Sequence, residues 1–251
     1  MSRSKPRIED LDAVIFDMDG VVTDTAVVHA AAWKRLFDEF LRARAETSGE
    51  AFVPFDGGAD YERYVDGKNR YDGVRSFLES RRISLPEGEA GDAPGTDTVR
   101  ALGNRKDEYF LEHIRAHGVV VYESTVRLIH RLLADGRRTA VVTASRNATE
   151  VLAASGLAGL FEEKVDGVVA ADLGLPGKPR PDTFLEAARR LGVEPARAAV
   201  VEDALSGVAA GRAGGFGLVV GVARHGRKDA LLEAGADVVV EDLAELEPDR
   251  A

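Results

Sequence analysis

The chain has 251 residues, 45% of them hydrophobic and 30% charged, which is the composition of a globular protein that can bury a sizeable core. Its formal net charge of −10 comes from 33 basic and 43 acidic residues, which argues against a nucleic acid as partner. The chain has no cysteine, and this excludes a disulfide framework, a thiolate metal site and a thiol nucleophile.

The N-terminal segment, MSRSKPRIED, is polar, and the apolar run that follows it is too short for a signal peptide or a membrane anchor. We therefore expect a cytoplasmic protein that has no membrane partner.

Short runs of β-branched residues alternate with longer stretches of helical periodicity, a pattern typical of parallel strands joined by crossover helices. Strands are predicted at Ala13–Phe16, Arg138–Thr143, Val165–Val169, Ala198–Glu202, Leu218–Val222 and Asp237–Val240. Helices between them are predicted at Ser124–Asp135, Asn147–Ser155, Pro181–Leu191 and Lys228–Ala234. The predicted fold class is α/β, with a doubly wound parallel sheet of the Rossmann-like kind.

Roughly 110 residues separate the first two predicted strands, which is too long for one crossover. Helical periodicity recurs there at His29–Ala45, Tyr71–Arg81 and Lys106–His117, and the Gly- and Pro-rich residues 86–98 read as a loop. We expect residues 26–114 to form an inserted helical cap domain. Residues 1–25 and 115–251 then form a discontinuous catalytic core.

Acidic residues follow two of the predicted strands. Asp17 and Asp19 stand at the end of the first strand, in AVIFDMDGVVTDT, and Glu202 and Asp203 stand at the end of the fourth. Ligands of parallel sheets bind beyond the carboxyl ends of the strands, so these acids should converge at one edge. Oxygen ligands without His or Cys favour Mg²⁺.

Two further segments at predicted strand ends carry groups suited to phosphate. TASRN, residues 143–147, offers Thr143, Ser145 and Asn147 near the start of a predicted helix. Lys178 stands between glycine and prolines in GLPGKPRPDTF. A divalent cation, a lysine and hydroxyl donors are the parts that phosphoryl transfer requires.

These motifs, DxDG from Asp17, Thr143, Lys178 and the acidic pair ending at Asp203, resemble those of the haloacid dehalogenase superfamily of aspartate-nucleophile phosphotransferases. The resemblance implies that Asp17 is the nucleophile and Asp19 the general acid and base. It also implies a Mg²⁺ ion held by Asp17, the backbone carbonyl of Asp19, Glu202 and Asp203.

Within that superfamily, DMDGVVTDTAVVHAAAW looks most like the β-phosphoglucomutase group, in which a helical cap follows the first strand. This resemblance implies substrate-binding roles for seven residues. They are Thr25, His29, Arg70 and Lys106 in the cap and Ser145, Arg146 and Asn147 in the core. Arg146 departs from the group, where a lysine is expected.

The expected activity is the interconversion of β-glucose 1-phosphate and glucose 6-phosphate through glucose 1,6-bisphosphate, with a small phosphorylated sugar as partner. A sugar-phosphate phosphatase on the same scaffold remains open, since water can replace the second sugar hydroxyl. A phospho-accepting signalling module is a remote alternative. Residues 86–104 contain no motif that indicates which sugar is bound. A monomer is expected, and an oligomer is left open.

Overall fold

The computed structural model describes residues 7–89, 91–224 and 226–246, which form two compact units. One unit contains the described residues up to Asp24 and from Val119 onwards, and we call it the core unit. The other, Thr25–Gly118, is inserted into it, and we call it the inserted unit. Among the described residues, no helix is long and apolar enough to cross a membrane.

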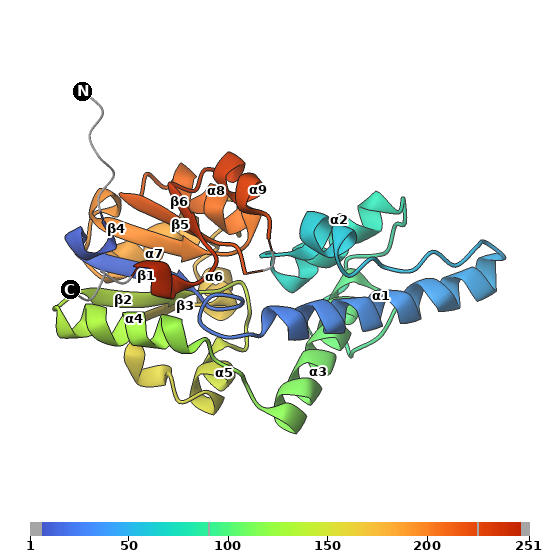
Figure 1. Cartoon of the computed structure of the whole chain (residues 1–251). Coiled ribbons are helices and arrows are strands. Elements are labelled where there is room, and N and C mark those ends of the chain that lie inside the picture. The colour runs from blue at the N-terminus through green and yellow to red at the C-terminus, as the bar shows by residue number, and fades with distance from the viewer. Residues whose placement is uncertain (1–6, 90, 225, 247–251) are drawn as a thin grey trace. The chain divides into compact units, whose positions relative to one another are not determined.

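The core unit is built on a six-stranded parallel sheet in the order β3-β2-β1-β4-β5-β6 (Figure 1). The strands are β1 Ala13–Asp17, β2 Arg138–Val142, β3 Glu163–Val165, β4 Ala198–Glu202, β5 Leu218–Val222 and β6 Val238–Val240. β1 lies between β2 and β4, with Asp17 beside Val142 in register. All six carboxyl ends therefore meet at one edge of the sheet. The expected α/β doubly wound fold is confirmed.

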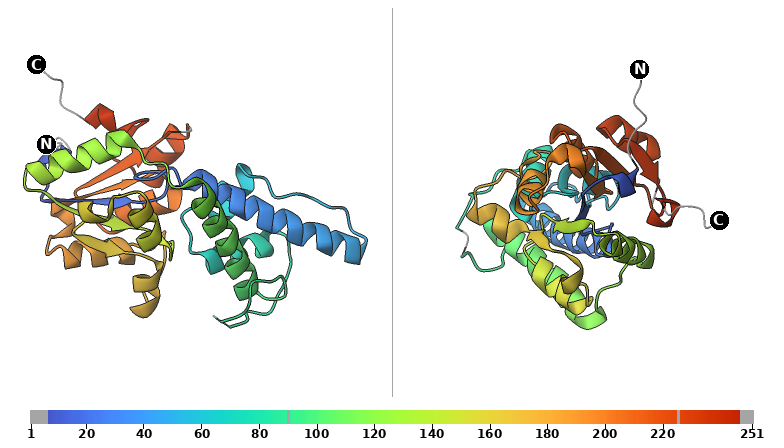
Figure 2. Two further views of the ribbon diagram at one scale, coloured as in Figure 1. Left: turned by 90° about the horizontal axis from the view of Figure 1, so that it is seen from below. Right: turned by 90° about the vertical axis from the view of Figure 1, so that its left-hand side faces the viewer.

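Helices cover both faces of this sheet (Figures 1 and 2). They are α4 Glu123–Ala134, α5 Ala148–Ala154, α6 Gly167–Asp172, α7 Asp182–Arg190, α8 Leu205–Ala213 and α9 Lys228–Ala234. Alternate strand residues such as Ala13, Ile15 and Val200 are fully buried and share one hydrophobic cluster with Phe184 of α7 and Val208 of α8. Alternation of side chains along each strand sends the others to the opposite face.

The predicted strand Val165–Val169 is wrong after its first residue. β3 ends at Val165, and α6 begins at Gly167. Asp166 is 1% exposed, and its carboxylate accepts hydrogen bonds from the backbone N–H groups of Val168 and Val169, both at 3.0 Å. This aspartate is a helix N-cap, and it outweighs the strand preference of the two valines.

The inserted unit contains three long helices, α1 Ala26–Ser48, α2 Arg70–Ser80 and α3 Val99–His117, with a π-helical turn at Tyr61–Val65. Its core is aromatic: Phe37 packs against Phe55 and Phe77, with ring centroids 5.2 and 4.0 Å away. α3 begins at Val99, earlier than the predicted Lys106, because the Thr98 hydroxyl accepts a hydrogen bond from Ala101 N at 3.0 Å and caps the helix. The described residues of 86–98 form neither helix nor strand, as predicted.

Candidate active site

The acidic ends of β1 and β4 are joined by one lysine. Lys178 lies in the loop before α7, is 6% exposed, and donates hydrogen bonds to Asp17 Oδ1 and to Glu202 Oε1. Asp17 and Glu202 are themselves 5% and 0% exposed. Two carboxylates from neighbouring strands are tolerated in this buried place because an ammonium group bridges them.

The pKa values of Asp17 and Lys178 are both raised, for different reasons. Burial raises the pKa of Asp17 well above its ordinary value, and the nearby carboxylates of Glu202 and Asp19 raise it further. The positive charge of Lys178 lowers this pKa but does not cancel the increase. Burial alone would lower the pKa of Lys178, but Asp17 and Glu202 outweigh it and raise that pKa. Lys178 is therefore a permanent positive charge beside the Asp17 carboxyl group.

Glu202 is held from two further directions. Its Oε2 accepts a hydrogen bond from Ala204 N at 2.7 Å, so both carboxylate oxygens have partners inside the protein. Gly207 of α8 packs directly against the carboxylate, since a Cβ atom there would lie 1.7 Å from Oε1. This packing leaves the Glu202 carboxylate little room to move away from Lys178. Binding of a metal ion, the role expected for Glu202, would compete with the hydrogen bonds that its carboxylate accepts from Lys178 and from Ala204 N.

Asp19 is oriented by Thr143, which follows β2. The Thr143 hydroxyl donates to Asp19 Oδ2 at 2.8 Å and accepts from Ser145 N at 3.0 Å. Thr143 is 2% exposed, so this two-sided bonding fixes the rotamer of its hydroxyl. The other oxygen of Asp19 is thus aimed by a buried group, the arrangement that a proton-transferring carboxylate needs.

The TASRN segment forms a turn before α5, which begins only at Ala148. Asn147 N donates to Ser145 Oγ at 3.2 Å, and the Asn147 side chain is buried whereas Arg146 is exposed. Of the expected phosphate-binding residues in the core, Ser145 and Asn147 therefore belong to one hydrogen-bonded turn beside Thr143.

The donors at the strand ends fit a divalent cation. Among the described residues, no three His, Cys, Asp or Glu side chains form a metal cluster. However, Gly20 approaches Asp203 so closely that an added Cβ would lie 2.1 Å from its Oδ2. This contact brings the Asp203 carboxylate against the loop that carries Asp19. Two carboxylates and a backbone carbonyl are oxygen donors that Mg²⁺ accepts, with water completing its coordination.

The inserted unit contains the other expected substrate-binding residues. Arg70 forms an ion pair with Asp107 at 2.6 Å, and Lys106 contacts His29 Nδ1. Lys106 is 5% exposed and lies 5.2 Å from the centroid of the Phe110 ring, while His29 stacks on that ring at 4.1 Å. Thr25 is also buried, and its carbonyl accepts a hydrogen bond from His29 N at 2.9 Å. The structure thus brings Thr25, His29 and Lys106 together.

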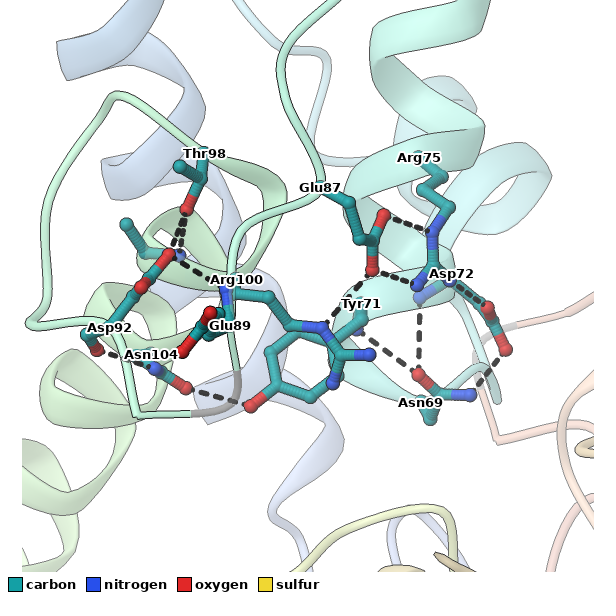
Figure 3. A network of polar contacts seen from close by, with 11 residues as sticks. Asn69, Tyr71, Asp72, Arg75, Glu87, Glu89, Asp92, Thr98, Arg100 and Asn104 are labelled. Atoms are coloured by element: carbon teal, nitrogen blue, oxygen red, sulfur yellow. Dashed lines mark hydrogen bonds and ion pairs between the residues drawn. The ribbon is translucent and has the colours of Figure 1, made fainter. Parts of the chain in front are cut away.

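A polar network fixes the start of α2 (Figure 3). The first residue of this helix is Arg70. Asn69 Oδ1 accepts hydrogen bonds from Tyr71 N and Asp72 N, both at 3.1 Å, and so caps the helix. Glu87 joins this helix to α3, because it accepts from Arg75 Nε at 3.0 Å and from Arg100 Nε at 3.1 Å (Figure 3). The cap and the bridge together orient the first turn of α2.

Residues that are not predicted from the sequence also contact the Asp17–Asp24 segment, among them Arg224 and Tyr122. Arg224 Nε donates to Gly20 O at 3.3 Å, and the Tyr122 hydroxyl donates to Asp24 Oδ1 at 2.7 Å. Arg224 follows β5, so its position at the carboxyl edge of the sheet could have been predicted from the sequence. Tyr122 follows no strand, and nothing in the sequence marks it.

Comparisons with known proteins match most of the chain. The model of the haloacid dehalogenase-like hydrolase family matches residues 11–215. The β-phosphoglucomutase of Mycobacterium tuberculosis (strain CDC 1551 / Oshkosh) is 52% identical over 241 residues, which cover 95% of this chain and 92% of that protein. The β-phosphoglucomutase of Bacillus subtilis is 30% identical, over 94% of this chain and 92% of that protein. Among solved structures, β-phosphoglucomutase from Clostridium difficile superposes with a TM-score of 0.74 at 26% identity, covering 94% and 93% of the two chains.

Proposed function

The chain belongs to the haloacid dehalogenase-like hydrolase family, and from that premise we propose that it is a β-phosphoglucomutase that works through an aspartyl phosphate. The chain is an enzyme of sugar-phosphate phosphotransfer, either a phosphoglucomutase or a phosphatase. The proposal that it is a β-phosphoglucomutase rests on the 52% identity to a β-phosphoglucomutase, which extends through both units of the fold.

The proposed chemistry has two half-reactions. In the first, a carboxylate oxygen of Asp17 attacks phosphorus, the bond to the sugar oxygen breaks, and Asp19 gives that oxygen a proton. In the second, a sugar hydroxyl attacks the aspartyl phosphate, Asp19 takes the proton back, and the Asp17 carboxylate leaves. Lys178 stabilises the negative charge on the transferring phosphoryl group in both directions.

A bound Mg²⁺ ion would be held by the carboxylates of Asp17 and Asp203 and by the carbonyl of Asp19. When bound, it would supply positive charge opposite the phosphoryl oxygens. Glu202 serves this site by holding Lys178 between itself and Asp17.

A mutase must also bind the phosphate that is not being transferred. In the inserted unit we assign phosphate binding to Arg70, whose guanidinium can bind a phosphate in a bidentate manner, and to Lys106. In the core unit we assign phosphate binding to Ser145, Arg146 and Asn147. For Arg70 this requires that the phosphate displace the carboxylate of Asp107, its present partner. The absence of nucleic acid and membrane partners, the monomeric state and the cytoplasmic location stay predictions.

The experiment is ³¹P NMR of the protein with Mg²⁺, β-glucose 1-phosphate and a trace of β-glucose 1,6-bisphosphate. We expect the glucose 6-phosphate resonance to grow faster than that of inorganic phosphate. Growth of inorganic phosphate alone would instead establish the phosphatase, which the hydrolase family model favours as second candidate. If neither resonance grows, glucose is the wrong sugar.

A further inference from the structure

The loop Met18–Asp24, which carries Asp19, is a closed turn of backbone. Gly20 N donates to Thr23 O at 2.7 Å, and Thr23 N donates to Met18 O at 2.9 Å. Gly20 has a φ of +86°, in the left-handed region that glycine adopts without strain. Since the loop is closed on itself, its place relative to the sheet depends on the groups that hold it from outside.

Arg224 is one of these groups, beside Thr143, which binds Asp19 itself. The Arg224 side chain is 11% exposed, and its guanidinium donates to Gly20 O at 3.3 Å and to Asp242 Oδ2 at 2.9 Å. A third donor, Nη2, lies 3.4 Å from the Thr125 hydroxyl. The planar fork of arginine can contact three groups in fixed directions, which the single ammonium of a lysine cannot.

Two residues extend this hold along the loop. Thr125 is fully buried, and its hydroxyl donates to Val21 O at 2.7 Å. The Tyr122 ring lies 3.7 Å from the Arg224 guanidinium carbon, and its hydroxyl donates to Asp24 Oδ1 at 2.7 Å. Burial raises the pKa of Tyr122, and the Asp24 carboxylate adds to the effect, so the phenol keeps its proton and remains a donor.

We propose that Arg224 is a positioning residue, which holds the Met18–Asp24 loop so that Asp19 can transfer protons. It holds Gly20 directly, and it reaches Val21 and Asp24 through Thr125 and Tyr122. This inference rests on the proposed function, because it gives Asp19 its role as acid and base. Proton transfer requires heavy atoms within hydrogen-bond reach, and a misplacement of about 1 Å can cost on the order of 100-fold in rate.

The test compares Arg224→Gln with a matched control, Arg197→Gln. Arg197 also ties the chain beside β1, since it donates to both carboxylate oxygens of Asp12 at 2.9 and 2.6 Å, but it does so at the amino edge of the sheet. We expect Arg224→Gln to lower kcat by at least about tenfold with KM changed less than about threefold, and Arg197→Gln to stay within about twofold of the parent protein. Equal kcat values in the two variants would overturn the proposal.

A second readout separates positioning from a general loss of structure. Acetate leaves acetyl phosphate without needing a proton, so phosphorylation of Asp17 by that reagent does not require Asp19, whereas attack by water does. Arg224→Gln should therefore accumulate more hydroxylamine-labile phosphoenzyme at steady state than the parent protein. Equal slowing of both steps would contradict the assignment. If Arg224→Gln fails to fold, Arg224→Lys, which keeps the charge and loses the fork, takes its place.

Failure of the proposed function has a different signature. If the parent protein forms no phosphoenzyme, Asp17 is not the nucleophile, and Arg224 is then judged by amide hydrogen exchange of residues 18–24. Exchange at least about tenfold faster in Arg224→Gln than in Arg197→Gln supports the hold on the loop. Unchanged protection overturns it, whatever the reaction is.

Discussion

At the scale of single residues, the candidate site depends on contacts between residues far apart in the sequence. Lys178 and Asp17 are separated by 161 positions, and the structure brings them into a buried ion pair. The sequence predicts each of them from its strand end, because carboxyl ends of parallel strands meet at one edge. It does not predict which carboxylates Lys178 bridges, because that depends on side-chain rotamers set by tertiary packing. The second contact of Lys178, to Glu202, is of this kind.

Asp17→Asn tests the proposed nucleophile. The amide cannot form the aspartyl phosphate, so we expect turnover to fall by at least about 10⁴-fold and the hydroxylamine-labile phosphoenzyme to disappear. The measurement is incorporation of ³²P from acetyl phosphate followed by an acid quench. Asp12→Asn, a change of the same size at the amino end of β1, serves as the control and should keep its phosphoenzyme. Labelling of Asp17→Asn at the level of the parent protein would assign the nucleophile to another residue.

Glu186, which is not a residue of the candidate active site, should make the free energy of unfolding depend on pH. Hydrogen bonds from Arg189 and Arg190 lower the pKa of Glu186 from 4.5 to about 2. A carboxyl group whose pKa is lower in the folded than in the unfolded protein stabilises the fold at any pH above its unfolded-state pKa. This contribution is lost as the pH falls towards the folded-state pKa of about 2. Arg189 is 70% exposed, so solvent screening limits the contribution to about 1 kcal/mol.

We therefore expect Glu186→Gln to lower the free energy of unfolding by about 1 kcal/mol at pH 7 and by almost nothing at pH 2. Urea unfolding of the variant and of the parent protein across this range measures the difference. Glu150→Gln, at an exposed position of α5, is the control and should change nothing at either pH. A difference that stays constant with pH would show that Glu186 acts through packing.

At the scale of helices and strands, the sequence predicts some elements to the residue and misses others for local reasons. Ala198–Glu202, Leu218–Val222 and Lys228–Ala234 are observed with their predicted bounds, because a distinct apolar pattern marks each of them. For α8, Leu205–Ala213, no bounds are predicted, since glycines lower helix propensity. Gly207 is there because Glu202 leaves no room for a Cβ, a reason that only the tertiary structure supplies.

Asp166→Ala tests why the predicted strand ends early. The substitution removes the cap of α6, and we expect a loss of about 1 kcal/mol in the free energy of unfolding. The measurement is chemical unfolding, with Asp172→Ala at the exposed last residue of the same helix as control. Equal stability of the two variants would mean that Asp166 does not hold the helix.

At the scale of the whole molecule, the inserted unit leaves and rejoins the core unit at paired backbone positions. Asp24 N donates to Val120 O at 2.9 Å, and Tyr122 N donates to Val22 O at 3.0 Å. The two chain ends of the core unit are therefore adjacent where residues 25–118 are inserted. A short linker can close this gap without strain in the sheet.

We expect a chain in which a Gly-Ser linker replaces residues 25–118 to fold with a cooperative thermal transition, because the six strands and their helices belong to the core unit alone. It should still form a phosphoenzyme with acetyl phosphate and should lose at least about 100-fold in turnover of a sugar phosphate. Circular dichroism and ³²P labelling measure the two outcomes, with the same deletion carrying Asp17→Asn as control. Failure to fold would show that the core unit needs the inserted one for its stability.

The central place of β1 in the sheet also has a consequence for biosynthesis. β1 is the first strand to leave the ribosome, yet its partner Ala198–Glu202 is encoded 185 codons downstream, counted from Ala13 to Ala198. At about 5 to 20 residues per second, its apolar edge waits about 10 to 40 s for that partner. During this interval the nascent chain presents the apolar residues Ala13–Phe16 with the edge for β4 unpaired, which makes it a substrate for chaperones and a nucleus for aggregation. A message truncated before codon 198 should yield an insoluble product rather than a partly active one.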